Sequence, residues 1–551
     1  MDRRRTLLLC AWTVAAALAV GLLSRDLPPE GFSSGDSGLK LIVARHAAAD
    51  PSRPFAIDLP AIAGAPVPFV DPMFQVHGEH AHALQAPLFP VLIAPLVAWL
   101  GLRGAYLLPA MAFVALLPLA AALSRRLGLA VGLTPLVVSA VLANPALFYA
   151  FEIWDHVPAI AVLAGATLLA FGEAGARGDA LRLAAAGLLA AIGILLRPEA
   201  IWYALALGTT LTAPRRMTSY AAGAVLVLVP FAAANYLEGG TIAGPHATAN
   251  LSALSDRWAS VRLERLSLWL APASPWFAAG IAGLVGAWAV RRWNGDPRLG
   301  QAIGLVAACA IAVAGAMERF PAPALWSAWP LGVLLLVPSG DARLGRLRWL
   351  AVASTLGIWL TSTHDGGAQW GPRFLLIATP AFLVLAAAAL HETTSEGRLR
   401  RLRVSLVAVI VLAGAWTSRH AVLDLRGVKR FHARLVAGLD RQVPPGAYVV
   451  SNIAWIDQIA ASLYGTRTWL IAAPPDQPRA MLERLERSGV PTISVVWSTD
   501  PVEPGPLSLD GSCYRLRDVV EVPERLIAIG RAECVSPVVR PLSHERPSAA
   551  P

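Results

Sequence analysis

The residue with the clearest chemical potential is Asp36, which follows the first hydrophobic stretch within the short polar run 33–37. A carboxylate that stays ionised can take a proton from a hydroxyl group, which is general-base chemistry. Aspartate is also a common helix N-cap, so a helix that starts near Ser37 would explain Asp36 without any reaction. Both explanations remain open from this residue alone.

Two turns between apolar stretches carry further ionisable groups. Glu152, Asp155 and His156 share one turn, and Arg197 and Glu199 flank a proline in another. Ionisable groups next to membrane spans are costly, so they are usually functional or paired. The acidic turn could instead cap the following helix. Arg197 could bind phosphate through its planar fork of donors, or it could form an ion pair with Glu199 or Glu152.

A glycine-rich stretch before a later apolar run contains His364, Asp365 and Arg373. Glycines allow a backbone to approach a ligand closely, so these three residues are candidates for binding. The alternative is a flexible surface turn. A fourth group, His77, Glu79, His80 and His82, lacks the spacing of common metal motifs, and we therefore predict no bound metal there.

Composition sets the class of protein that carries these residues. The chain has 551 residues, of which 56% are hydrophobic and only 15% are charged. A soluble domain would have about 25% charged residues. Its apolar runs are long enough to cross a hydrocarbon core of about 30 Å. The net charge of +10 comes mainly from arginines clustered between these runs, which is typical of cytoplasmic loops and argues against nucleic-acid binding.

The hydrophobic pattern predicts a polytopic membrane protein with about thirteen transmembrane helices. The first is an uncleaved span over 6–23 with its N-terminus in the cytoplasm. The others are expected at 104–123, 131–151, 157–171, 181–196, 200–213, 218–236, 274–290, 300–317, 324–337, 346–362, 373–390 and 404–419.

The run 87–100 decides on which side of the membrane everything after it lies. If this run does not cross, most arginines between spans face the cytoplasm, as the positive-inside rule requires. We therefore expect a juxtamembrane or re-entrant helix in a first outer loop, 24–103. It follows that Asp36 and the three other chemical clusters all lie on the outer face, and this shared side is what makes them candidates for one site.

The domain organisation follows from the change in composition near residue 421. We expect a membrane domain over 1–420, a small extracytoplasmic α/β domain over 421–535 and a disordered tail over 536–551. Alternating strand and helix patterns over 447–497 predict parallel strands. No glycine-rich phosphate motif follows the first of them, so nucleotide binding is not expected. Cys513 and Cys534 can form a disulfide only in an oxidising compartment, and the sequence does not decide whether they do.

These features resemble the GT-C superfamily of polyprenyl-phosphate-sugar-dependent membrane glycosyltransferases, which includes protein O-mannosyltransferases and aminoarabinose transferases of lipid A. The similar parts are an acid in the first outer loop, a proline-rich apolar helix, a small-residue helix with an acidic turn, a short hairpin and a Trp-Gly-Pro-Arg-Phe-Leu-Leu stretch. They correspond to Asp36, 85–90, 144–156, 195–200 and 370–376.

The resemblance implies transfer of a sugar from a lipid phosphate to a glycan, lipid or protein acceptor at the outer face of the inner membrane. Asp36 would be the base of an inverting reaction. Arg197, Arg373 and His364 would bind the donor phosphate. The remaining candidates would bind substrate: Glu152, Asp155, His156, Glu199 and Asp365. No second acid adjoins Asp36, which favours a mechanism without metal or other cofactor.

Two other functions remain open. A transporter or flippase of lipid-linked sugars would also be polytopic, but transporters usually show internal repeats and binding groups near the membrane midplane. We see no repeat, and the polar groups gather at the outer face. A non-catalytic membrane assembly protein could use the α/β domain to bind a partner, and substitution of Asp36 would then have no effect.

Overall fold

The computed structural model describes residues 3–172, 178–242, 244–245, 258–270, 274–294, 297–318, 324–336, 341–362, 370–394, 400–472, 477–500, 507–522 and 527–535. The chain forms two compact units. The first comprises Met1–Leu27 and Gln85–Gly427, and the second comprises Pro28–Leu84 and Val428–Pro551. The sequence analysis assigned the first outer loop to the membrane domain, whereas most of that loop belongs to the same compact unit as the C-terminal region.

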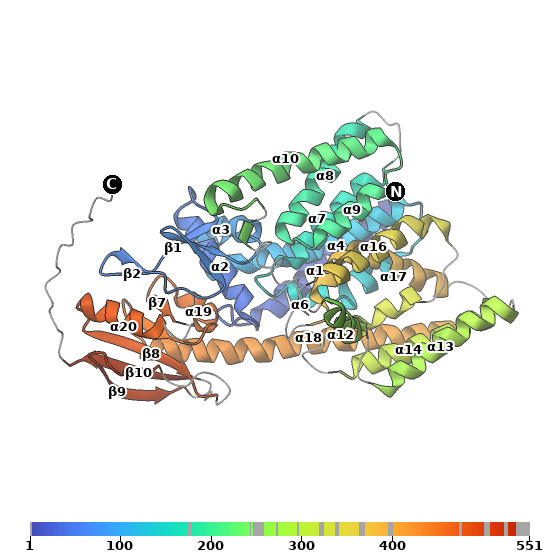
Figure 1. The fold of residues 1–551 in the computed structure, drawn as a ribbon. Helices are drawn as coiled ribbons and strands as arrows, with labels where there is room; N and C mark the ends of the chain where they lie inside the picture. The colour runs from blue at the N-terminus through green and yellow to red at the C-terminus, as the bar shows by residue number, and fades with distance from the viewer. Residues whose placement is uncertain are drawn as a thin grey trace. The chain divides into compact units, whose positions relative to one another are not determined.

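The first unit is helical (Figure 1). Its elements are α1 (Arg3–Arg25), α3 (Leu88–Leu100), η1 (Gly101–Tyr106), α4 (Leu107–Arg126), α5 (Leu133–Val137), η2 (Val138–Leu142), α6 (Ala146–Tyr149), α7 (His156–Ala170), α8 (Asp179–Leu196), α9 (Ala200–Thr209), α10 (Pro214–Gly239), α12 (Trp258–Leu270), α13 (Pro275–Ala289), η3 (Val290–Asn294), α14 (Pro297–Ala316), α15 (Leu325–Ala328), η4 (Pro330–Leu336), η5 (Ala342–Leu344), α16 (Gly345–Thr361), η6 (Arg373–Ala378) and α17 (Thr379–Thr394). The long helix α18 (Arg400–Gln442) contains residues of both units.

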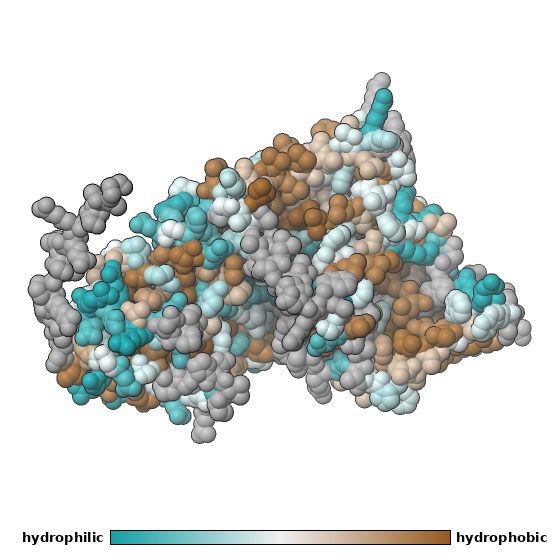
Figure 2. Space-filling model, in the orientation of Figure 1, coloured by the Kyte–Doolittle hydropathy of each residue, from teal (hydrophilic) through white to brown (hydrophobic). Residues whose placement is uncertain are grey.

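Seven helical segments in the described part of the chain are long and apolar enough to cross a membrane, which supports the predicted multi-pass protein. The predicted number of thirteen spans stays a prediction. In an apolar 18-residue window of Arg373–Thr394, 89% of the residues are buried, so neighbouring helices surround it, whereas the share in such a window of Pro214–Glu238 is only 11%. Large apolar side chains such as Leu226 and Val229 are exposed on α10, and apolar side chains gather over the helical region in Figure 2. Such a surface suits contact with lipid.

A sharp turn separates α3 from α4. Gly101 adopts a positive φ of 66°, a conformation that favours glycine. A Cβ on Gly104 would lie 2.0 Å from the carbonyl oxygen of Leu96, so the 3₁₀ turn η1 folds back tightly against α3. The helix over 88–100 is therefore distinct from the span after it, as the sequence analysis expected. That it does not cross the membrane stays a prediction.

Two of the predicted spans are interrupted. The run 131–151 divides into α5, η2 and α6, and the run 324–337 divides into α15 and η4. Asn144 causes one of the breaks, because its side-chain oxygen accepts a hydrogen bond from Ala146 N at 3.0 Å and its amide donates to Ala140 O at 3.0 Å. An asparagine that satisfies backbone groups in this way offers the chain an alternative to a continuous helix.

The second unit contains a five-stranded sheet in the order β7-β6-β8-β10-β9. Its strands are β6 (Tyr448–Ser451), β7 (Thr468–Ile471), β8 (Thr492–Ser498), β9 (Tyr514–Glu521) and β10 (Ile527–Cys534), accompanied by α19 (Ile456–Ile459), η7 (Ala461–Leu463) and α20 (Gln477–Arg487). β6 pairs in parallel with β7 and β8, which confirms the three predicted parallel strands. The antiparallel strands β9 and β10 were not predicted.

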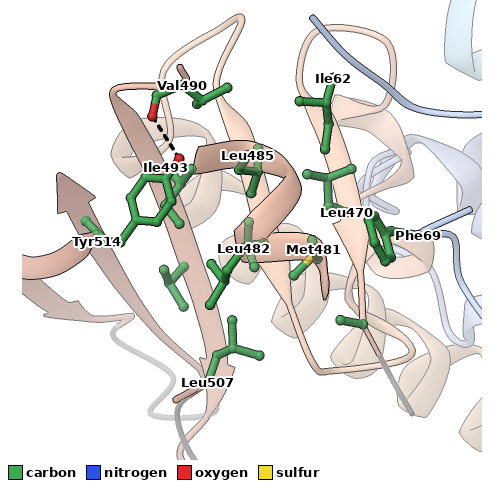
Figure 3. Close-up of a cluster of buried hydrophobic side chains, with 14 of the residues drawn as sticks. Ile62, Phe69, Leu470, Met481, Leu482, Leu485, Val490, Ile493, Leu507 and Tyr514 are labelled. Carbon is green, nitrogen blue, oxygen red and sulfur yellow. Dashed lines mark hydrogen bonds between the residues drawn. The ribbon is translucent and has the colours of Figure 1, made fainter. Parts of the chain in front are cut away.

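The N-terminal part of the second unit is folded into the same core. It contains α2 (Gly35–Ala49), β1 (Ala56–Asp58), β2 (Ala61–Ile62), β3 (Ala65–Pro66), β4 (Phe74–His77) and β5 (His80–Ala83). Ile62 and Phe69 pack with Leu470 and Met481 in one hydrophobic cluster (Figure 3). Ile471 N also donates a hydrogen bond to Phe69 O at 3.1 Å. These contacts explain why the loop and the C-terminal region form one unit, although several hundred residues separate them.

A disulfide joins Cys513, just before β9, to Cys534 at the end of β10. This answers the question that the sequence left open, and it pairs the ends of two neighbouring antiparallel strands. In the described part of the chain, the free cysteines are Cys10 and Cys309.

We expect Cys513 and Cys534 to be protected from a maleimide reagent in the unfolded protein until a reductant is added, whereas Cys10 and Cys309 react without reduction. The double variant Cys513→Ser/Cys534→Ser should lower the stability of the second unit by about 3 kcal/mol, because the disulfide closes a loop of 21 residues. Mass shifts on gels and melting temperatures measure the two effects. Labelling of all four cysteines without reductant would contradict the disulfide.

Candidate functional site

Three helix ends meet in the first unit and bring ionisable side chains together. Asp155 is the N-cap residue of α7, Arg197 is the C-cap residue of α8 in an extended conformation, and Glu199 is the N-cap residue of α9. Pro198 separates the last two, and a proline disfavours helical backbone at the residue before it, so the hairpin turns at Arg197. The start of η6 supplies Arg373.

Arg197 lies between two carboxylates. Its guanidinium contacts Asp155 Oδ1 at 3.3 Å and also donates a hydrogen bond to Glu199. Asp155 Oδ1 lies 3.3 Å from His156 Nδ1 as well. The relative exposure of Asp155 is 1% and that of Arg197 is 7%. Of the alternatives that the sequence left open for Arg197, the ion pair with Glu199 is present, and Asp155 is an additional partner that the sequence analysis had not paired with Arg197.

Aromatic rings line the same cluster. The rings of Tyr149, Trp154 and His156 lie 5.1–5.2 Å apart, centroid to centroid. Arg373 stacks over Trp154 at 5.5 Å and over Phe374 at 5.2 Å. Arginine over an aromatic face gains a cation–π attraction, and the ring fixes the plane of the guanidinium. None of these aromatic contacts was predicted.

One hydrogen bond ties the two sides of the cluster together. The Tyr149 hydroxyl donates to Trp370 O at 2.6 Å, which links α6 to the segment that leads into Arg373. Phe374 is shared by both arginines, because the Arg197 guanidinium also lies 5.7 Å from its ring. Two guanidinium groups therefore lie against one ring.

The structure places the other predicted residues as follows. Glu152 and His156 are fully buried in or beside the same turn. His364 and Asp365 lie outside the described residues. Asp36 belongs to the second unit, and its approach to the arginines stays a prediction. The binding roles of all these residues remain predictions.

The surroundings of Asp36 correct one explanation for it. Helix α2 begins at Gly35 with Ser34 at the N-cap, so Asp36 is within the first turn rather than capping a helix that starts near Ser37. A carboxylate in the first turn interacts favourably with the helix dipole. Asp36 is half-buried, and Lys40, one turn later, is buried.

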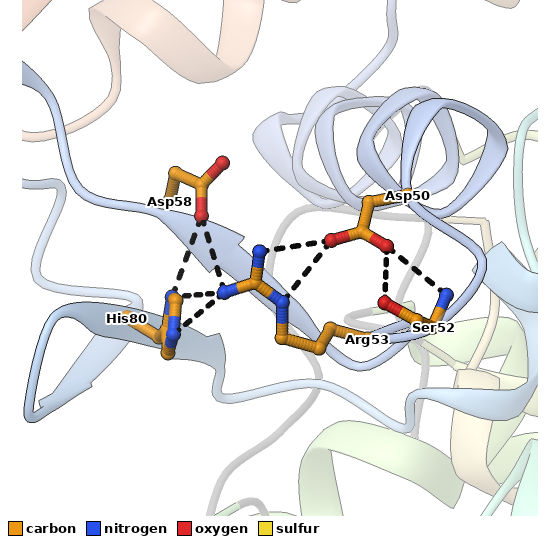
Figure 4. A network of polar contacts seen from close by, with 5 residues as sticks. All are labelled: Asp50, Ser52, Arg53, Asp58 and His80. Carbon is orange, nitrogen blue, oxygen red and sulfur yellow. Dashed lines mark hydrogen bonds and ion pairs between the residues drawn. The ribbon is translucent and has the colours of Figure 1, made fainter.

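One member of the histidine group of the first outer loop, His80, forms ordinary polar contacts (Figure 4). Arg53 contacts His80 Nε2 at 2.7 Å and Asp50 Oδ2 at 2.9 Å, and Asp58 Oδ1 lies 3.4 Å from His80 Nδ1. Burial lowers the pKa of His82, which favours the neutral ring. Among the described residues, no group of three or more His, Cys, Asp or Glu is arranged to hold a metal ion.

The architecture defines an α-helical membrane protein with an attached α/β unit. Solved structures share it: that of ArnT from Cupriavidus metallidurans bound to undecaprenyl phosphate has a TM-score of 0.55 and 12% identity, covering 96% of this chain and 98% of that one. Its apo form gives a TM-score of 0.51 and 13% identity, with 95% and 97% covered. At 12–13% identity, these likenesses show a shared fold.

A more distant match is the oligosaccharyltransferase AglB from Archaeoglobus fulgidus in complex with an inhibitory peptide and a dolichol-phosphate. Its TM-score is 0.46 at 13% identity, with 89% of this chain and 69% of that one covered. Comparison with protein-family models gave no match, and comparison with curated proteins gave none either.

The buried ion pairs predict a large effect of Arg197→Met on stability. This change leaves Asp155 and Glu199 without their cation, and breaking a buried pair in this way costs about 3–5 kcal/mol. Arg343→Met is the matched control, because Arg343 also pairs with an aspartate, at 2.7 Å, but is 55% exposed. We expect the melting temperature in detergent to fall strongly for Arg197→Met and little for Arg343→Met. Equal shifts would show that burial does not distinguish the two pairs.

Proposed function

We propose that this protein is a membrane glycosyltransferase that moves a sugar from a polyprenyl-phosphate donor to the hydroxyl group of an acceptor. The observation that carries the proposal is the fold, which this chain shares over nearly its whole length with a structure of ArnT bound to undecaprenyl phosphate. A second observation supports it: the buried turns of the first unit hold two arginines against one aromatic ring.

The donor phosphate would bind at these arginines. Arg197 already donates to Asp155 and Glu199, so its positive charge is balanced within the protein. Arg373 lies over the rings of Trp154 and Phe374, and the planar guanidinium fork matches the geometry of phosphate oxygens. We therefore assign the phosphate contacts to Arg373, Arg197 and His364.

The proposed reaction requires a base on one side of the sugar and the donor phosphate on the other side. Asp36 would accept the proton of the acceptor hydroxyl as its oxygen bonds to the anomeric carbon. The bond between that carbon and the phosphate oxygen breaks, and the polyprenyl phosphate leaves with the bonding electrons. Attack opposite the leaving group inverts the anomeric centre. The neighbours of Asp36 in sequence offer no second acid, so the proposed reaction uses no metal.

The remaining polar residues would shape the substrate site. Asp155 and Glu199 hold Arg197, and Asp155 also contacts His156. We assign substrate contacts to this group, to Glu152 and to Asp365. The site would face the extracytoplasmic side of the inner membrane, and the disulfide in the second unit supports this side, because disulfides persist in oxidising compartments.

The proposed base predicts that Asp36→Asn abolishes transfer from a polyprenyl-phosphate sugar, because an amide cannot take the acceptor proton. Asp50→Asn is the matched control, since Asp50 is the C-cap residue of the same helix and pairs with Arg53. We expect the control to retain transfer and both variants to insert into membranes normally. Transfer of radiolabelled sugar to membrane acceptors measures the rates. An unchanged rate in Asp36→Asn would remove this residue from the mechanism.

The proposed phosphate site predicts that Arg373→Met weakens binding of undecaprenyl phosphate about 10–100-fold, because a hydrogen bond to a charged group contributes about 1.5–3 kcal/mol. Arg373→Lys should bind weakly too, since an ammonium group lacks the planar fork. Arg346→Met is the control, because Arg346 also stacks on an aromatic ring, that of Phe171, at 4.8 Å. Microscale binding measurements with all three variants decide: equal affinity in Arg373→Met and Arg346→Met would overturn the assignment.

A further inference from the structure

The first turn of α2, which carries Asp36, packs against α19 within the second unit. Two glycines make this contact and flank Asp36 in the sequence. A Cβ on Gly35 would lie 1.6 Å from Gln458 Oε1, and a Cβ on Gly38 would lie 1.6 Å from the main-chain oxygen of Gln458. At Gly35 an added side chain would displace the Gln458 amide, whereas at Gly38 it would meet main chain, so the helices would have to move apart.

Gln458 is itself held firmly. Its Nε2 donates to Asp71 Oδ2 at 2.7 Å and to Ala454 O at 3.3 Å, and its main-chain N donates to Asp457 Oδ1 at 2.9 Å. Because the amide nitrogen points toward Asp71, the amide oxygen points toward Gly35. The orientation of this one side chain is therefore linked to the position of the α2 N-terminus.

A buried pair of carboxyl groups fixes the amide. Asp71 and Asp457 are both almost fully buried, and each carboxyl group shifts the pKa of the other. Both oxygens of Asp71 accept hydrogen bonds, one from Gln458 Nε2 and the other from Met73 N at 2.6 Å, and burial raises the pKa of Asp71. Burial, then the charge of Asp71, raises the pKa of Asp457 well above its usual range, so Asp457 carries the proton.

The other end of α2 is fastened to the same region. One guanidinium nitrogen of Arg45 lies 3.0 Å from Ala461 O, 3.0 Å from Ser462 O and 3.4 Å from Tyr464 O. All three carbonyls belong to η7 or the residues beside it, directly after α19. Helix α2 is thus held near both ends by the C-terminal part of the second unit.

We propose that the C-terminal α/β region positions the catalytic base, with Gln458 as the positioning residue that holds the first turn of α2 and hence Asp36. The inference rests on the proposed function, in which Asp36 is the base. It assigns the α/β region a task inside the reaction itself, since a base must stay within hydrogen-bond reach of the acceptor hydroxyl.

Gly38→Ala tests the contact most directly. The added methyl group meets the main-chain oxygen of Gln458, so α2 must move, and a misplacement of about 1 Å can lower a rate about 100-fold. We expect kcat to fall by about this factor while the affinity for undecaprenyl phosphate stays unchanged, because the arginines of the first unit are not altered. Gly286→Ala is the control, as nothing lies within 4 Å of a Cβ at this position in α13.

Gln458→Glu provides a second test that depends on pH. The charged and titratable groups around this position are Asp71, Asp457, Tyr464, Arg45, Lys40 and Asp36. In this variant a protonated carboxyl group can donate to Asp71 as the amide does, whereas an ionised carboxylate repels Asp71. The ratio of variant to wild-type kcat should therefore rise toward 1 as the pH is lowered, whereas a role in packing alone would give a constant ratio.

The outcomes separate this inference from the proposed function. If Asp36→Asn retains transfer, the proposed base is wrong, and the positioning role falls with it. If Asp36→Asn abolishes transfer while Gly38→Ala and Gln458→Glu keep the wild-type kcat at every pH, only the positioning role is overturned. Hydrogen exchange of the α2 amides checks the contact without any activity: faster exchange is expected in Gly38→Ala, and unchanged exchange would contradict the contact.

Discussion

A guanidinium group buried among apolar helices has to be neutralised where it lies, because removing a charge from water costs several kcal/mol even after relaxation. In the first unit that constraint falls on Arg197. Its two carboxylate partners come from different helices. The charge can be neutralised only when the start of α7, the end of α8 and the start of α9 lie at the same place. The ion pairs therefore set where the spans begin and end around the candidate site, and the aromatic contacts are arranged on that frame.

In the second unit, a helix is held by close contact at its first turn. Helix α2 approaches α19 at Gly35 and Gly38, and Asp71 fixes the amide of Gln458 that faces Gly35 through a directional hydrogen bond. Hydrogen bonds to a charged acceptor are stronger than neutral ones. Close backbone contact combined with a charge-assisted hydrogen bond holds the first turn of α2 rigidly. A reacting group must be held rigidly by the residues around it.

Much of the candidate site could be predicted from the sequence, for a physical reason. Charged residues next to long apolar runs are rare, so Asp155, Arg197 and Arg373 stood out by residue type and position alone. The aromatic partners Tyr149 and Trp154 did not, because an aromatic residue in an apolar stretch looks the same whether it packs in the core or lines a site. The breaks in two predicted spans were also missed, since short polar residues such as Asn144 act through local hydrogen bonds that hydropathy does not register.

Composition could not predict that the first outer loop and the C-terminal region fold into one compact unit. Its strands β1 to β5 are two to four residues long, below the length at which alternation can be recognised, and their partners in the core come from segments several hundred residues away. Asp36 could therefore be proposed as a base from its place after the first span. The role of Gly35 and Gly38 can be inferred only from the structure, in which both glycines contact Gln458.

The folding of residues 28–84 and 428–551 into one unit also affects how the protein is synthesised. Residues 28–84 leave the ribosome long before residues 428–551 exist, and at about 5–20 residues per second the interval is on the order of half a minute. During that time the apolar side chains of residues 28–84 lack their C-terminal packing partners, and α2 lacks its contact with α19. The core of this unit can form only after β8, β9 and β10 have been synthesised, so biogenesis itself delays the folding of the early segment.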